Sequence, residues 1–286
     1  MGLFWKRWAI RVVRIAVAVY LGVTLVLFLW QNSFIFPGAA TQGHPDCLVH
    51  AGANSELLEL HARDGTKIAA LFGKASVGDP SHAASVIFCY GNGACLAYSD
   101  NEFNHLRQCG ANVIIPEYEG YGMSGGSPSE AGCYAAADAA YDYLLSRADI
   151  DHDKIVASGW SLGAAAAIDL AARKPVAGLM TFSAFTNIRA MARRLIPWLP
   201  TSLIVRSSFD NLGKIRGIHC PMLIVHGVID DLIPPRMSDA LSAAAGGPVT
   251  RVRVEGARHN DLFDVGGAKL WNQVAEFLAD LKGINR

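Results

Sequence analysis

The sequence predicts an α/β fold: a doubly wound, mostly parallel eight-stranded sheet with a short cap and an N-terminal transmembrane helix. Three observations lead to this prediction. Short β-branched runs alternate with Ala-rich helical patterns along most of the chain, which is typical of βαβ units. The later runs are apolar on both faces, as strands buried inside a parallel sheet must be. An uncharged apolar run precedes the whole pattern.

The apolar run covers Ile15–Trp30 and contains neither charge nor proline. With Val12 and Val13 it reaches the roughly 20 residues that a bilayer-spanning helix needs. Four basic residues precede it, and the next Lys or Arg is Arg63. This asymmetry places the N-terminus in the cytoplasm and exports the rest of the chain. We therefore predict a membrane anchor at 1–36, with membrane lipid as its partner and a transmembrane segment at about 12–30.

A cleaved signal peptide is the alternative for this segment. Its apolar core usually has about 7–15 residues and ends at a small-residue cleavage site. Here the run is longer, and Gln31–Phe36 offers no such site, while Gly38–Ala40 lies further downstream. A buried core helix is a third interpretation, which the flanking cations disfavour. The uncleaved anchor is preferred, so the domain at 37–286 is expected to be periplasmic, extracellular or lumenal.

Composition limits the function classes. The 286 residues include 25 Lys+Arg and 25 Asp+Glu, so the formal net charge is zero. A neutral chain lacks the basic surface that would attract nucleic acid, so no nucleic-acid partner is expected. Only 17% of residues are charged, against about 25% in soluble domains, and the anchor supplies much of the apolar excess. The roughly 250 residues after it suffice for one large domain.

The predicted strands follow in order. They are 57–60, 67–73, 85–90, 112–116, 154–158, 177–182, 221–225 and 250–254. One helix between them has a clear start, because Ser127 resembles an N-cap, Pro128 suits the first helical position, and Glu130 lies three residues after the cap. This helix is predicted to continue to about Arg147.

Residues 187–216 lie between the sixth and seventh predicted strands and carry two prolines among bulky apolar side chains. We interpret them as a short cap over the carboxyl edge of the sheet, where ligands bind in such folds. Ordinary connecting helices are the alternative.

The pentapeptide Gly159–Gly163 has the pattern G-x-S-x-G, and its context makes it informative. A predicted strand enters it and a small-residue helical pattern leaves it. A nucleophile at such a turn adopts a strained backbone conformation, and tiny residues must stand two positions before and after it. Ser161 is therefore the predicted nucleophile. Gly122–Gly126 matches the same pattern, but its predicted helix starts only after the glycines, so Ser124 is rejected.

A serine nucleophile needs a base, and the base needs an orienting acid. Asp230 follows the seventh predicted strand and His259 follows the eighth. The chain order Ser, Asp, His is the order that this architecture imposes. Asp231 is the alternative acid. His226, beside the seventh strand, is interpreted as structural.

The oxyanion of an acyl-transfer intermediate needs two donors. One is predicted to be the main-chain N–H of Leu162, directly after the nucleophile. The other is assigned to Asn92, with Gly93 as the alternative, in the loop after the third predicted strand. Cys95 in that loop lacks a neighbouring base.

No C-x-x-C motif is present, and the G-x-G-x-x-G match at Gly120, Gly122 and Gly125 is rejected as a dinucleotide site because it follows the fourth predicted strand, not the first βα turn. No metal site and no cofactor are therefore predicted.

These residues together resemble the α/β-hydrolase superfamily, and in particular its single-pass, membrane-anchored serine hydrolases. The resemblance covers nearly all of 50–286. It is carried by the sequence blocks YGNG at 90–93, EYEGYGMSGGSPSE at 117–130, GWSLG at 159–163, and HGVIDDLIP at 226–234 with RHND at 258–261. It implies Ser161 as nucleophile, Asp230 as acid, His259 as base, and Asn92 with Leu162 as the oxyanion hole.

Three residues depart from that family pattern. Tyr90 stands where His is usual, Glu117 where Asp or Asn is common, and Glu119 where Arg is usual. We expect these departures to change the polarity of the substrate pocket.

The sequence thus predicts a membrane-anchored serine hydrolase that cleaves carboxylic esters or thioesters of a small-molecule or lipid-derived acyl substrate. An aminopeptidase or amidase is the alternative, in which Glu117 or Glu119 would bind a substrate N-terminus. A non-catalytic binding protein on the same fold is a third hypothesis. Loss of Ser161, Asp230 or His259 would favour it, and all three are present.

Overall fold

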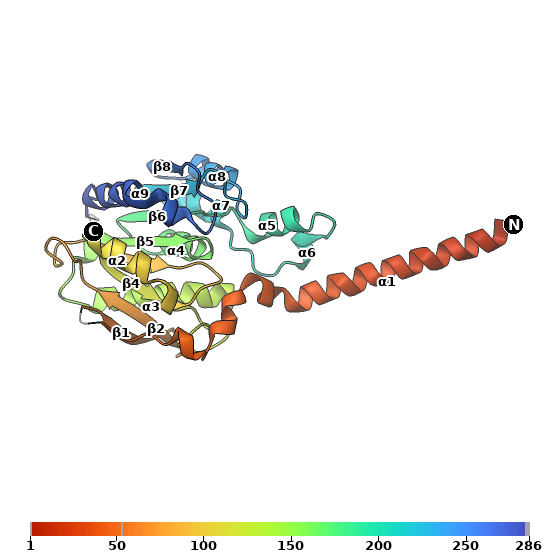
Figure 1. The fold of residues 1–286 in the computed structure, drawn as a ribbon, viewed down its shortest axis with the longest axis horizontal. Helices are drawn as coiled ribbons and strands as arrows, with labels where there is room; N and C mark the ends of the chain where they lie inside the picture. The colour runs from red at the N-terminus through yellow and green to blue at the C-terminus, as the bar shows by residue number, and fades with distance from the viewer. Residues whose placement is uncertain (1, 53, 284–286) are drawn as a thin grey trace.

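The computed structural model describes residues 2–52 and 54–283 and has an eight-stranded sheet at its centre (Figure 1). The strand order is β1-β2-β4-β3-β5-β6-β7-β8, in which β2 is antiparallel to both of its neighbours, β1 and β4, and all other neighbouring strands pair in parallel. The bounds are β1 Glu56–His61, β2 Lys67–Gly73, β3 Ser85–Cys89, β4 Asn112–Pro116, β5 Ile155–Trp160, β6 Gly178–Phe182, β7 Met222–Gly227 and β8 Val249–Val254. The predicted fold class and strands are confirmed.

Helices cover both faces of the sheet. On one face α2 packs against α9, and on the other α3 packs against α4. The central strands β3, β4 and β6 are buried along their whole length, which explains their continuous apolar sequence. The helices that cover the sheet are α2 Asp100–Gln108, α3 Glu130–Ser146, α4 Leu162–Arg173, α8 Arg236–Ala244 and α9 Leu262–Ala279.

The predicted start of α3 is wrong by two residues. Ser129, not Ser127, is the N-cap, and its hydroxyl accepts a hydrogen bond from the Gly132 N–H at 2.9 Å. Pro128 is outside the helix and packs so closely on Gly120 that a Cβ there would collide with it. Glu130 makes no capping box, because it is the first residue of α3 and its carboxylate accepts hydrogen bonds from the Ser208 and Phe209 N–H groups, within the segment 187–216.

The segment predicted as a cap contains three short helices, α5 Ile188–Leu195, α6 Thr201–Ile204 and α7 Asn211–Lys214. In Figure 1, α5 and α6 extend away from the sheet toward α1. In contrast, α7 packs on α4 at the side of the sheet. Only the first part of 187–216 therefore lies over the carboxyl edge.

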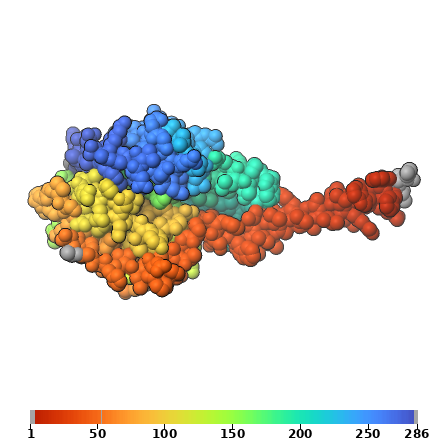
Figure 2. All heavy atoms as spheres, viewed as in Figure 1, coloured from red at the N-terminus to blue at the C-terminus, as the bar shows by residue number. Residues whose placement is uncertain are grey.

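The N-terminal helix α1, Gly2–Ile35, projects from the carboxyl edge of the sheet (Figures 1 and 2). Its segment Phe4–Ile35 is long and apolar enough to cross a membrane, and none of its most apolar window is buried inside the protein. This exposure argues against a core helix. Beyond α1, short 3-10 turns at Pro37–Thr41 and Pro45–Cys47 lead to β1.

Candidate active site

Ser161 occupies the sharp turn between β5 and α4. Its φ is 56° and its ψ is −114°, a region that non-glycine residues adopt only under strain. A Cβ on Gly159 would collide with the Gly163 carbonyl, and one on Gly163 would collide with the Cys89 carbonyl. The two glycines therefore let strand and helix approach each other closely enough to form the turn.

His259 connects the serine to a carboxylate. Its Nε2 lies 2.9 Å from the Ser161 Oγ, and its Nδ1 lies 2.8 Å from the Asp230 Oδ2. Because the carboxylate only accepts, Nδ1 carries the proton and Nε2 accepts from the serine hydroxyl. Serine, histidine and aspartate are 7%, 4% and 6% exposed. This arrangement suits removal of a proton from Ser161 as it attacks a carbonyl.

Asp230 lies directly after β7, where main-chain groups hold it in place. Its Oδ1 accepts hydrogen bonds from the Leu232 N–H at 3.0 Å and the Ile233 N–H at 2.7 Å. Burial opposes ionisation of this carboxyl, but hydrogen bonds from His226 and His259 together hold its pKa well below the usual value. The alternative acid, Asp231, is exposed and pairs with Arg258 instead.

His226, which the sequence analysis interpreted as structural, also contacts the candidate site, and this contact was not predicted. It is buried in β7, and its Nε2 lies 3.2 Å from the Asp230 Oδ2 and 2.8 Å from the Ile233 carbonyl. Both neighbours are acceptors, so Nε2 carries a proton, while Nδ1 faces the Ser238 hydroxyl. Two imidazoles therefore bind one carboxylate. The sequence signal for this contact is that His226 and Asp230 are four residues apart, on either side of the end of β7.

Asn92 and Leu162, the predicted oxyanion donors, lie with Ser161 on the wall of one cavity. Leu162 is the first residue of α4, where main-chain N–H groups have no partner within the helix. The Asn92 side chain is engaged elsewhere, because its Nδ2 donates to the Ile35 carbonyl at the end of α1. The alternative donor Gly93 does not line the cavity.

This cavity has a volume of about 430 Å³ and is predominantly apolar. Its described lining contains no Asp, Glu, Lys or Arg, and its polar side chains are Gln31, Asn92 and Ser161. The walls come from the end of α1, from the cap and from the sheet edge. The apolar lining residues are Leu27, Phe34, Ile35, Leu162, Phe185, Ile188, Met191, Ala192, Leu195, Ile196, Ile204, Val205, Leu232 and Ile233.

The three departures from the family pattern do not line this cavity, so the expectation that they change its polarity is wrong. Tyr90 donates its hydroxyl hydrogen bond to Glu117 at 3.1 Å, and both are buried. Glu117 also accepts from the N–H groups of Leu96 and Met123. Glu119 lies against Gly132 at the start of α3. Tyr90 and Glu117 therefore pair with each other and do not line the cavity.

Cys95 has the properties of a buried thiol. Burial, with a contribution from a hydrogen bond to the neighbouring Cys47, raises its pKa to about 12. A thiol with such a pKa is protonated at neutral pH and is a poor nucleophile.

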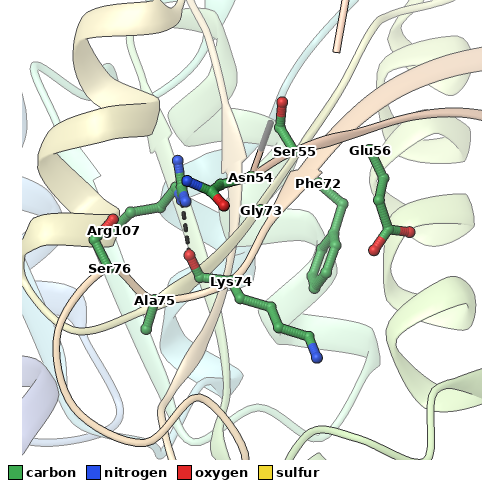
Figure 3. A pocket seen from close by; sticks show the side chains of 9 residues that line it. All are labelled: Asn54, Ser55, Glu56, Phe72, Gly73, Lys74, Ala75, Ser76 and Arg107. Atoms are coloured by element: carbon green, nitrogen blue, oxygen red, sulfur yellow. Dashed lines mark hydrogen bonds between the residues drawn. The ribbon is translucent and has the colours of Figure 1, made fainter. Parts of the chain in front are cut away.

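Another hollow lies at the opposite edge of the sheet and contains none of these residues (Figure 3). It is lined by the end of β2 and by Arg107, whose side chain donates to the Lys74 carbonyl at 2.7 Å. Gly73 pairs with Val113 at the start of β4, so this hollow is at the amino edge of the parallel strands. Ligand sites of such sheets lie at the carboxyl edge.

Known proteins resemble this chain in sequence. A family model described as the alpha/beta hydrolase fold matches residues 84–204. An uncharacterized protein of Mycobacterium tuberculosis is 30% identical over 275 residues, which is 95% of each chain. Alpha/beta hydrolase domain-containing protein 17B of Xenopus tropicalis is 33% identical over 199 residues, covering 69% of this chain and 67% of the relative.

Solved structures resemble it in fold. An esterase of Pyrococcus furiosus has a TM-score of 0.66 at 20% identity, covering 82% of this chain and 97% of the other. A puromycin-hydrolyzing peptidase of Mycobacterium tuberculosis has a TM-score of 0.67 at 16% identity, covering 81% and 40%. At such identities the likeness is one of fold.

Proposed function

The chain belongs to the α/β-hydrolase family, and on that premise we propose that it is a membrane-anchored serine hydrolase of carboxylic esters or thioesters. The family supports hydrolase activity. The observation that carries the finer proposal is the continuous hydrogen-bonded line from Ser161 through His259 to Asp230.

In the proposed mechanism the Ser161 Oγ attacks the substrate carbonyl while His259 Nε2 takes the serine proton. The main-chain N–H groups of Leu162 and Asn92 stabilise the oxyanion. Asp230 stays ionised and stabilises the imidazolium. His259 then protonates the leaving group, and a water molecule, activated by the same imidazole, hydrolyses the acyl-enzyme.

The cavity supports an apolar acyl chain as the substrate group next to Ser161. Its described lining contains no carboxylate to bind a substrate N-terminus, which disfavours the aminopeptidase alternative. Glu117 is also engaged with Tyr90 and main-chain N–H groups. Removal of an acyl chain from water into such a site is favourable at roughly 0.8 kcal/mol per methylene.

The anchor belongs to the same proposal. We assign α1 to a single membrane crossing with its basic N-terminal end in the cytoplasm. Its apolar side chains are exposed along most of the helix, and a bilayer would remove them from water. The hydrolase domain is then on the exported side.

Labelling with a fluorophosphonate probe tests the mechanism, because such probes react with activated serines. We expect label on the intact chain and on Ser124→Ala, and none on Ser161→Ala. Ser124 is the matched control: it belongs to the second G-x-S-x-G sequence, but its hydroxyl donates to the Glu117 carbonyl and accepts from the Ala69 N–H.

Label retained on Ser161→Ala would refute the nucleophile assignment. The absence of label from every form, together with a failure to hydrolyse esters of any acyl length, would favour the binding-protein hypothesis. Faster turnover of amides than of the matching esters would favour the amidase alternative.

A further inference from the structure

The cap segment Leu195–Ile204, here called the cap tip, is uncharged and carries exposed apolar side chains. Its sequence is LIPWLPTSLI. Leu195, Trp198 and Leu203 are 63%, 55% and 82% exposed. Large apolar side chains gathered on one short surface segment are typical of an interaction site.

The cap tip lies beside α1 over a considerable length (Figure 2). Near one end of the contact, the Tyr20 hydroxyl donates to the Trp198 carbonyl at 3.2 Å, and the two rings are 6.1 Å apart. At the other end, the Gln31 amide donates to the Ile204 carbonyl at 3.2 Å and accepts from the Arg206 N–H at 2.8 Å. These contacts fix the cap tip along the second half of α1.

The position of the cap tip along α1 determines how deep the cap tip would lie in a bilayer that α1 crosses. Tyr20 precedes Gln31 by 11 residues, a rise of about 16 Å along a helix at 1.5 Å per residue. The hydrocarbon core of a bilayer is about 30 Å thick. If α1 crosses the membrane with its apolar run, the cap tip next to it lies within the leaflet on the domain side.

We propose that the cap tip inserts into this leaflet beside α1, so that the cavity above Ser161 takes its acyl chain from a lipid or a lipid-anchored molecule in the same leaflet. This inference rests on the proposed membrane anchor and deepens the proposed esterase function. It adds an interaction surface, the bilayer, and a route by which the substrate arrives.

The backbone of the cap tip suits an apolar environment. Main-chain N–H groups buried in hydrocarbon need internal partners. Those of Ile196, Leu199, Thr201, Leu203 and Ile204 donate to carbonyls within the cap. Pro197 and Pro200 have no N–H to satisfy.

Basic side chains bracket the cap tip on both sides. Arg193 and Arg194 precede it and Arg206 follows it, and all three are exposed. The Arg206 guanidinium donates to the Phe28 carbonyl at 3.0 Å and lies 4.6 Å from the Phe28 ring centre. It is therefore level with the end of the apolar run of α1, where lipid phosphates are found. Arginine binds phosphate well.

The cavity connects this surface to the nucleophile. Its lining includes Leu27 of α1, and Leu195 and Ile204 of the cap tip, as well as Ser161. The same two elements that would contact the acyl region of the bilayer thus form the walls of the acyl site. An acyl chain could reach Ser161 without crossing water.

Fluorescence quenching of the full-length protein in phosphatidylcholine–phosphatidylglycerol vesicles tests the insertion. An environment-sensitive dye is attached at Leu203→Cys, at Val17→Cys in α1 and at Val77→Cys, an exposed loop residue after β2. The half-buried Cys109 and Cys220 are replaced by serine in all three.

We expect nitroxide groups on lipid acyl chains to quench the dyes at positions 203 and 17, and aqueous iodide to quench only the dye at 77. Iodide quenching at 203 with shielding at 17 would overturn the insertion and leave the anchor intact. Iodide quenching at both would overturn the anchor and this inference together.

A kinetic comparison tests the substrate route. The double variant Trp198→Gln/Leu203→Gln changes exposed residues that do not line the cavity, and Val77→Gln is its control. We expect an unchanged rate on a short water-soluble ester, and a fall of about tenfold or more on a long-chain ester held in vesicles, because two large apolar anchors are lost.

An equal fall on both esters, or no fall on the vesicle-held ester, would overturn this route. Should the wild-type chain hydrolyse neither ester, the substrate route falls with the proposed function, while the quenching result still decides the insertion separately.

Discussion

At the scale of single residues, the distinctive feature is one carboxylate shared by two histidines. Asp230 lies 2.8 Å from the His259 Nδ1 and 3.2 Å from the His226 Nε2, and it accepts two main-chain hydrogen bonds. A buried charge is stable only when such donors replace water. The proposed role of Asp230 as orienting acid therefore depends on residues outside the triad.

Asp230→Asn tests the orienting role. The amide preserves the shape of the side chain but does not hold His259 with its proton on Nδ1. We expect kcat on a soluble ester to fall by about 10⁴-fold, as in comparable triads, while circular dichroism stays unchanged. Asp231→Asn, at the exposed neighbour, is the control and should retain activity. Loss in the control and retention in Asp230→Asn would exchange the two roles.

His226→Leu tests whether His226 is a positioning residue. Removing one donor to a charged group costs roughly 1.5–3 kcal/mol, and the displaced carboxylate orients His259 less well. We expect kcat to fall by about tenfold with KM unchanged, measured on a soluble ester. His219→Leu, the exposed histidine before β7, should match wild type. Equal changes in both variants, or a change in KM alone, would contradict this role.

At the scale of elements, α1 has a role beyond the membrane anchoring that its composition predicts. Its last turns supply Leu27, Phe34 and Ile35 to the cavity wall. The Ile35 carbonyl accepts from Asn92, which connects α1 to the loop of the proposed oxyanion hole. The helix α1 and the candidate site are therefore one packed unit.

Gln31→Ala tests this coupling. Gln31 is buried and hydrogen-bonds to the Ile204 carbonyl and the Arg206 N–H, so its removal leaves both without these partners. We expect a loss of about 1–3 kcal/mol in stability and a higher KM for long-chain esters, measured by denaturation and by kinetics in detergent. Gln108→Ala, at an exposed position of α2, should change neither. An unchanged KM would show that the cap keeps its position over the cavity without the hydrogen bonds of Gln31.

At the scale of the whole molecule, sheet topology brings the candidate site together. β5, β7 and β8 run parallel, so the segments that follow them emerge at one edge. His259 is 98 residues from Ser161 in sequence and 29 from Asp230. α1 leaves from the same edge, which turns the candidate site toward the proposed membrane.

The stability of the whole fold should depend on pH through Asp230. Its pKa is lowered in the folded state, so its contribution is fully present above the unfolded pKa of about 3.9 and is lost as the pH falls through the lower folded value. We expect the wild type to be more stable than Asp230→Asn at neutral pH and this difference to narrow below about pH 4. Denaturation at several pH values measures it, and a constant difference would contradict it.

The sequence alone determined what depends on local pattern. Strand positions follow from β-branched runs, the strained turn at Ser161 from its two glycines, and the possible membrane span from an uncharged run. Local pattern was misleading at Ser127, because Pro128 packs against Gly120 in the loop before α3 and lies outside the helix. Only the tertiary structure decided that Tyr90 and Glu117 pair beneath the site, that His226 reaches Asp230, and that α1 forms a cavity wall. The first and third of these contacts join segments far apart in the chain, and the second depends on the path of the loop after β7. Residue periodicity encodes neither the packing of whole elements nor the path of a loop.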